Sequence, residues 1–306
     1  MKNINDISEL KQFENLELLA KQVVEGFITG LHKSPFHGFS VEFSEHRLYN
    51  AGESTKNIDW KLYGKTDKLF VKRYEEETNL RCRIIIDTSS SMLFPYKNKD
   101  IQSKLAFSVF SAAAIINLLR QQRDAAGLTL FSDDIELHTR AKMSSSHTRL
   151  LYSHLNKLIS ENIPLNKKTK PAKLLHLISE KIHKRSLVVI FSDMFGSENP
   201  EKLFSALQHL KHNKHEIILF HVTDKKHETE FQYNNRPYKF VDMETGETIK
   251  LNPNEIRYYY TSSSRSYIEK LKLKCGQYKI DFVEADVNTD FKNVLVPYLI
   301  KRTKMH

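Results

Sequence analysis

The chain has 306 residues, 40% hydrophobic and 27% charged, so it can bury a globular core and is not disordered throughout. Its 47 Lys and Arg against 37 Asp and Glu give a formal charge of +10, which favours acidic partners without specifying a fold. Two cysteines exclude a disulfide framework and a four-cysteine zinc site, and they fit a reducing compartment. Neither a signal-peptide core nor an apolar stretch of roughly 20 residues occurs, so we expect a cytoplasmic protein.

Residues 1–80 predict a small N-terminal α+β module. Apolar residues at helical spacing predict a helix over about 13–30, which Gly30 can end. The alternating run 39–43 and the run 68–74, rich in strand-forming residues, predict two short strands after that helix.

Residues 81–306 predict an α/β domain with an open, mostly parallel, doubly wound sheet. Short apolar runs alternate with helical patterns, which places helices on both faces of the sheet. The expected strands are 83–86, 128–131, 135–137, 187–192, 217–220 and 279–283. The expected helices are 105–119, 148–160, 171–183, 200–212, 264–275 and 289–301.

One segment, at about 224–260, interrupts this alternation. It contains three strand-like runs separated by turn-like residues, at 231–233, 238–241 and 248–251. We therefore expect a β-hairpin insertion in the α/β domain.

Polar side chains follow two of the predicted buried strands. Asp87, Ser89 and Ser91 come directly after the strand 83–86, and Asp193 follows the strand 187–192. Ligands of open parallel sheets bind beyond the carboxyl ends of the strands, and carboxylates and hydroxyls are the hard oxygen donors that Mg²⁺ prefers. The first loop alone could equally be a helix cap. The second aspartate favours a cation site, because two strand-end carboxylates can converge on one ion.

A third oxygen donor is expected from the loop between these strands. Thr148, at the start of the helix 148–160, is our choice, and Ser146 is the competitor. An ordinary capping role for Thr148 is an equally good interpretation.

These residues resemble the metal-ion-dependent adhesion site of von Willebrand factor type A domains, which are Rossmann-like. Longer motifs resemble the bacterial family called domain of unknown function 58. Residues 38–53 are similar to its G-x-x-x-E-F-x-x-x-R-x-Y-x-x-G-D motif, 58–60 to its I-D-W stretch, and 242–247 to its D-x-E-T-G-E motif. The resemblance runs from about residue 35 to the C-terminus. Glu53 stands where the family usually has Asp, and Gly64-Lys65 replaces a more common Ala-Arg.

The resemblance implies a metal-dependent protein-binding domain without an established enzymatic activity. By position, the ligands of Mg²⁺ (or Mn²⁺ or Ca²⁺) would be Asp87, Ser89, Ser91, Thr148 and Asp193. In such sites an Asp or Glu of the partner fills the last coordination position. Members of the family are often associated with AAA+ ATPases of the MoxR type, which makes such an ATPase the expected partner.

Two other functions are weaker. A Mg²⁺-dependent phosphatase using Asp87 as its nucleophile would usually need a second carboxylate two residues later, where this chain has Ser89. Nucleic-acid binding has only the net charge in its favour, since no recognisable motif accompanies it, and we expect none. No G-x-x-x-x-G-K-[ST] phosphate loop is present, which argues against ATP hydrolysis by that route.

Overall fold

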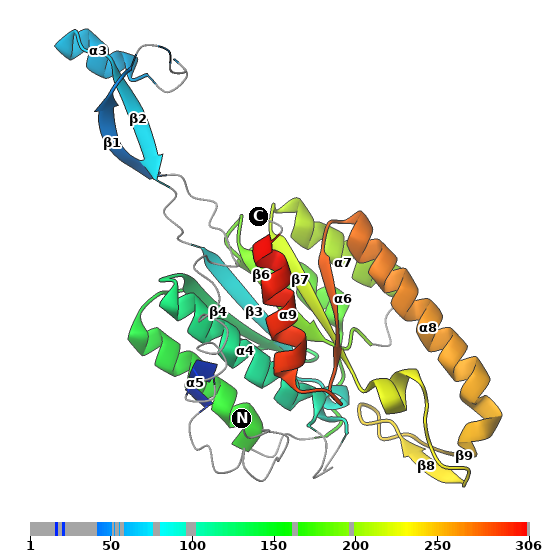
Figure 1. Cartoon of the computed structure of the whole chain (residues 1–306). Helices are drawn as coiled ribbons and strands as arrows, with labels where there is room; N and C mark the ends of the chain where they lie inside the picture. The colour runs from blue at the N-terminus through cyan, green and yellow to red at the C-terminus, as the bar shows by residue number, and fades with distance from the viewer. Residues whose placement is uncertain are drawn as a thin grey trace. The chain divides into compact units, whose positions relative to one another are not determined.

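The computed structural model divides the chain into two compact units, 36–80 and 1–35 with 81–306. It describes residues 16–17, 20–21, 42–50, 52, 55, 58–75, 80–95, 102–160, 165–195 and 199–304 (Figure 1). The expected boundary after residue 80 agrees with this division. The N-terminal residues do not, because they group with the large unit rather than with 36–80.

The N-terminal helix predicted over 13–30 lies mostly outside the described residues. Its described members, 16–17 and 20–21, are helical. Leu16 and Ala20 are buried, and Glu17 forms an ion pair with Arg120 at 2.6 Å. These contacts connect the N-terminal residues to the large unit.

The small unit is a hairpin with a short helix between its strands. β1 (Glu42–Leu48) pairs antiparallel with β2 (Phe70–Glu75), in place of the strands predicted at 39–43 and 68–74. The helix is α3 (Trp60–Thr66), and the Asp59 Oδ1 atom accepts hydrogen bonds from the backbone N–H groups of Lys61 and Leu62 at 3.0 and 3.1 Å. Asp59 of the Ile58-Asp59-Trp60 stretch is therefore a helix cap.

The large unit contains the predicted open sheet, with strands in the order β10-β7-β6-β3-β4-β5. All neighbouring pairs are parallel except β4 and β5. The central strands are continuous apolar runs buried on both faces, as parallel strands under two helix layers require. The strands are β3 (Arg81–Asp87), β4 (Ala125–Phe131), β5 (Ile135–His138), β6 (Leu187–Ser192), β7 (Glu216–Thr223) and β10 (Asp281–Asp286).

Helices cover both faces of the sheet, which confirms the doubly wound α/β prediction. One layer contains α4 (Lys104–Gln121), α5 (Ser145–Ser160) and α9 (Phe291–Lys304). The other contains α6 (Pro171–Lys181), α7 (Pro200–His212) and α8 (Pro253–Gln277), as Figure 1 shows. α8 is longer than the predicted 264–275, because Asn252 caps it and Pro253 starts it. None of the described helices is both long enough and apolar enough to cross a membrane.

The predicted insertion is a hairpin preceded by an aromatic cluster. β8 (Tyr238–Val241) and β9 (Thr248–Leu251) pair antiparallel, as expected. The strand-like run 231–233 is not a strand, because Phe231 has a φ of +48° and its ring packs against Phe240 and Tyr260 at 5.6 and 4.5 Å. A single π-helical turn, η3 (Lys225–Thr229), precedes this cluster.

Candidate metal centre

The structure brings the two predicted aspartates to the same rim of the sheet. Asp87 is the last residue of β3 and Asp193 directly follows β6, its parallel neighbour. Both are fully buried. Asp87 Oδ2 accepts a hydrogen bond from Ser192 Oγ at 2.7 Å, and its Oδ1 accepts one from the Ser89 backbone N–H at 3.0 Å. Burial, and then the Asp193 carboxylate, raise the pKa of Asp87 above its ordinary value.

The two serines of the first loop lie beside Asp87. Ser89 is buried and Ser91 is half-buried, and their hydroxyl oxygens are 3.1 Å apart. Ser89 precedes the short 3₁₀ helix η2 (Ser90–Leu93) but makes no side-chain capping bond to it. Helix α4 is capped by Ser103 instead, whose hydroxyl accepts from the Ala106 backbone N–H at 3.1 Å. The capping alternative therefore does not account for these hydroxyls.

The structure does not bring Thr148 to this site, contrary to our expectation. Thr148 lies in the first turn of α5, where its hydroxyl donates to the Ser144 carbonyl at 3.3 Å. The neighbouring His147 ring bonds the Ala126 carbonyl, at the amino end of β4. Asp87 pairs with Phe131 at the opposite end of that strand. Ser146, also near Ser144, is at the amino end as well.

Thr169 occupies the place expected for Thr148. Two hydrogen bonds connect its loop to the first loop, from the Ser90 backbone N–H to the Lys167 carbonyl at 3.1 Å and from the Lys167 N–H to Ser90 Oγ at 2.8 Å. Thr169 is buried, and its Oγ1 atom has no hydrogen-bond partner among the described residues. A buried hydroxyl without a partner is costly unless a ligand satisfies it. The sequence feature that could have identified Thr169 is its position two residues before Pro171, the proline that starts α6.

Lys104 contributes a buried positive charge that the sequence analysis missed. It is the first residue of α4, and its Nζ atom lies 2.8 Å from Asp193 Oδ2 and 2.5 Å from Glu228 Oε1. The Lys104 and Asp193 side chains are both fully buried. Burial lowers the pKa of Lys104, but the two carboxylates outweigh burial and raise it above the ordinary value. Lys104 thus balances the negative charge of Asp193, whereas Asp87 forms no ion pair with any described cationic side chain.

Glu244 brings a further carboxylate to the site from the β8–β9 turn. Its Oε2 atom accepts a hydrogen bond from the Thr169 backbone N–H at 3.2 Å, and the Ser91 side chain lies close enough to lower its pKa. Burial, together with the Asp193 and Asp242 carboxylates, raises the pKa of Glu244 to about 7. The hairpin motif 242–247 therefore belongs to the same constellation as the strand-end residues.

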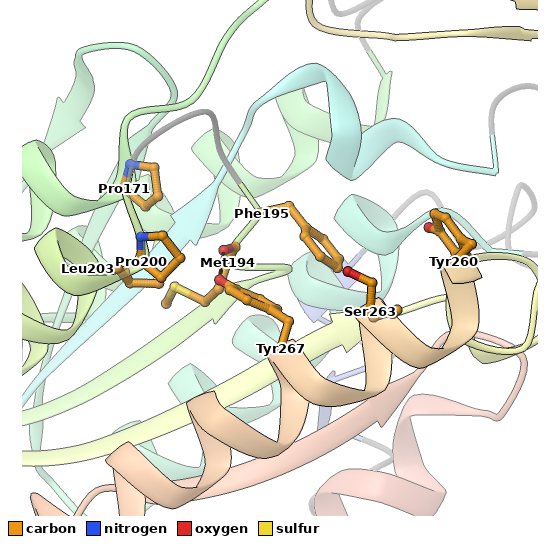
Figure 2. A pocket seen from close by; sticks show the side chains of 9 residues that line it. Pro171, Met194, Phe195, Pro200, Leu203, Tyr260, Ser263 and Tyr267 are labelled. Atoms are coloured by element: carbon orange, nitrogen blue, oxygen red, sulfur yellow. Dashed lines mark hydrogen bonds between the residues drawn. The ribbon is translucent and has the colours of Figure 1, made fainter. Parts of the chain in front are cut away.

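An apolar groove of about 360 Å³ begins next to Asp193. Figure 2 shows Tyr267 of α8 beside Met194 and Phe195, which directly follow Asp193, and Tyr260 farther along the same helix. The Tyr267 hydroxyl donates to the Met194 carbonyl at 2.6 Å, and its ring stacks on Phe195 with centroids 5.5 Å apart. These aromatic contacts shape the wall of the groove beside the candidate site.

The donor set suits a hard divalent cation held with few charged ligands. No group of three or more His, Cys, Asp or Glu side chains able to hold a metal ion occurs among the described residues, so a cation at this rim would need hydroxyl ligands as well. Asp87 has no cationic partner and Thr169 Oγ1 has no partner of any kind in the described part of the chain. Oxygen ligands of this kind, completed by water or a partner's oxygen, match Mg²⁺ chemistry.

Two solved structures align with most of this chain at low sequence identity. The chain resembles the crystal structure of conserved hypothetical protein BatB from Bacteroides thetaiotaomicron at 13% identity, over 74% of this chain and 99% of that one, with a TM-score of 0.42. It resembles the SpRpn10 VWA domain at 14% identity, over 71% and 93% of the two chains, with a TM-score of 0.37.

Uncharacterized protein Rv1480 of Mycobacterium tuberculosis is 22% identical over 224 residues, which are 73% of this chain and 68% of that protein. The family model described as "Protein of unknown function DUF58" matches residues 45–269. The chain therefore belongs to the DUF58 family.

Proposed function

We propose that this protein is a metal-dependent protein-interaction module that captures an Asp or Glu of its partner through a divalent cation. One observation carries the proposal: an unpaired buried carboxylate and an unpartnered buried hydroxyl, those of Asp87 and Thr169, occur in loops that converge on one rim of the sheet. A cation would balance the charge of Asp87, whose hydrogen bonds come only from neutral groups, and it would give Thr169 Oγ1 the partner that the described chain does not supply.

Each residue has a separate task in this proposal. Ser89, Ser91 and Thr169 would offer hydroxyl oxygens, and Asp87 would supply the negative charge. Asp193 would orient the site while Lys104 balances its charge. The cation, Mg²⁺ or else Mn²⁺ or Ca²⁺, would supply a positive centre to which a partner's carboxylate can bind.

The groove beside Asp193 suggests the remaining chemistry of the partner. Its apolar and aromatic lining would accept an apolar side chain next to the captured acid. The family resemblance makes a MoxR-type AAA+ ATPase in the cytoplasm our proposed partner, and the net charge of +10 is compatible with an acidic surface on it. We propose no nucleic-acid partner.

We propose that the protein is not an enzyme. The phosphatase alternative needs Asp87 to attack a phosphoryl group, but Asp87 is fully buried and both of its oxygens accept hydrogen bonds. The position two residues later is Ser89, which cannot replace a carboxylate as acid and base.

Calorimetric titration with Mg²⁺ tests the proposal. Asp87→Asn keeps the shape of the side chain and removes its charge, so we expect Mg²⁺ affinity to fall at least 100-fold, about 2.7 kcal/mol. Asp133→Asn, which neutralises an exposed carboxylate beyond the end of β4, should bind as the wild type does. Equal affinities in wild type and Asp87→Asn would show that the site assignment is wrong.

The partner is sought by affinity capture from cells with and without a chelator. A specific partner should be retained only with the cation, and Asp87→Asn should lose it while Asp133→Asn keeps it. A partner that survives both the chelator and Asp87→Asn binds elsewhere, which would contradict capture through the cation.

A further inference from the structure

Glu244 is held by a turn that is well ordered by its own hydrogen bonds. The Asp242 carboxylate accepts from the backbone N–H groups of Glu244 and Thr245 and from the Thr245 hydroxyl, at 2.8, 3.4 and 2.8 Å. Gly246 follows with a φ of +76°, a conformation that favours glycine. The turn depends on the Asp242 side chain and not on that of Glu244, which remains free to point at the site.

The turn is attached to the site through the loop that contains Thr169. The Asn166 backbone N–H donates to the Met243 carbonyl at 3.0 Å, and the Thr169 N–H donates to the Glu244 carboxylate at 3.2 Å. The Ser91 side chain is also near enough to lower the pKa of Glu244, so the Glu244 carboxylate lies close to two of the proposed oxygen donors. Lys104 lies against Asp193 and Glu228 instead.

Glu244 lacks a positive partner in this position. It is half-buried, and it forms no ion pair with a Lys, Arg or His of the described chain. The nearest charges that act on it are the carboxylates of Asp193 and Asp242, which repel it. A carboxylate held against other carboxylates and an unpartnered hydroxyl is suited to a shared cation.

We propose that Glu244 is an internal ligand that occupies the partner's position at the cation and must leave before a partner's carboxylate can bind. The proposal rests on the proposed function and adds a regulatory step to it. The hairpin would then be a gate, closed when Glu244 faces the site and open when a partner replaces it.

The hairpin can open at moderate cost. Among the described strands, the four-residue β8 and β9 pair only with each other, and a two-stranded sheet without a third strand gains little stability from its own pairing. An internal carboxylate competes at an effective concentration of about millimolar. A free carboxylate that binds weakly is therefore excluded, and a partner with further contacts, such as contacts in the groove, can displace Glu244.

Titration with Mn²⁺, followed by the relaxation rate of water protons, tests this gate. Glu244→Gln can still accept the bond from Thr169 but coordinates poorly, so water should take the vacated position. We expect Mn²⁺ affinity to fall about threefold to tenfold, and relaxation per bound Mn²⁺ to rise by the contribution of one water. Added acetate should reverse that rise in Glu244→Gln and have little effect on the wild type.

Hydrogen exchange of residues 238–251 gives an independent measurement. Mn²⁺ should slow exchange of this hairpin in the wild type and not in Glu244→Gln. Glu247→Gln changes an exposed carboxylate in the same turn and should behave as the wild type. Suppose that Glu244→Gln matches the wild type in relaxation and exchange while Asp87→Asn no longer binds Mn²⁺. The proposal that Glu244 gates the site would then be wrong, and the proposed metal site at Asp87 would be supported. If the wild type does not bind Mn²⁺, both proposals fall.

Discussion

The two ends of the parallel sheet use similar polar residues in different ways. At the amino end, the hydroxyl of Thr148 is bonded within its own helix, and the His147 ring is bonded to a β4 carbonyl. At the carboxyl end, Thr169 Oγ1 is buried with no partner in the described chain, and Asp87 has no cation to balance it. A hydroxyl that the fold itself satisfies is structural, whereas one left without a partner beside an uncompensated carboxylate, as at Thr169, is a candidate for a ligand.

The largest expected effect concerns the charge balance of the carboxyl end. Lys104→Met removes the buried ammonium group and leaves Asp193 and Glu228 without compensation, so we expect the free energy of unfolding to fall by about 3–5 kcal/mol. Urea denaturation measures this change. Lys270→Met breaks an exposed ion pair with Glu201 and should cost less than about 1 kcal/mol. A similar loss of stability in both variants would mean that the buried ion pairs of Lys104 matter no more to folding than an exposed ion pair does.

A middle-sized effect distinguishes the two threonines directly. Thr169→Val keeps the shape of the side chain and removes the unpartnered hydroxyl, so Mg²⁺ affinity should fall about tenfold, or 1.4 kcal/mol, with little loss of stability. Thr148→Val makes the same change at the other end and should leave the affinity unaltered. The reverse result in calorimetry would restore Thr148 as the ligand.

The smallest expected effect lies at the amino end and depends on pH. Burial, followed by the nearby His183 and Lys211, lowers the pKa of His215 to about 4, and the Ser186 backbone N–H donates to its Nδ1 atom at 3.2 Å. Because the unfolded histidine binds a proton near pH 6.5, His215 destabilises the fold as pH falls from 6.5 towards 4.

His215→Asn provides the measurement for this effect. Asn can accept the same bond and does not titrate, so it should reduce the stability lost between pH 7 and pH 5.5 by about 1.2 kcal/mol. Denaturation at both pH values gives the difference. An unchanged pH dependence would show that His215 is already free to protonate in the folded protein.

The strands and the two aspartates were predictable because continuous apolar runs ended abruptly in polar residues. Ile84–Ile86 before Asp87, and the run 187–191 before Ser192 and Asp193, required buried strands with their polar ends at a rim. The family match confirms the resemblance to DUF58. The ligand roles implied by the resemblance to the metal-ion-dependent adhesion site stay predictions.

Thr148 was misplaced because the sequence analysis did not decide which way the strand at 135–137 runs. Only three residues separate β4 from β5, too few for a parallel crossover, so β5 must turn back. The chain therefore returns to the amino end before α5 begins, and α5 brings it back to the carboxyl end at Thr169. The length of the loop between β4 and β5 was therefore the part of the sequence that indicated the direction of β5.

Lys104 and Glu244 could not be found from local patterns. Lys104 resembles an ordinary polar residue in a first helical turn, and only the approach of Asp193, 89 positions away, explains its burial. Glu244 belonged to a recognisable motif, but its position against Thr169 depends on how the hairpin folds over a distant loop.

The short strand β5 has a consequence for how other chains can approach this protein. A sheet edge offers unpaired backbone groups to which a foreign strand can add, and natural proteins shorten or charge such edges. β5 has four residues, reverses the direction of the sheet and includes Glu136, which is paired with Lys167 at 2.8 Å. Lateral growth into fibres or swapped dimers is therefore disfavoured on this flank.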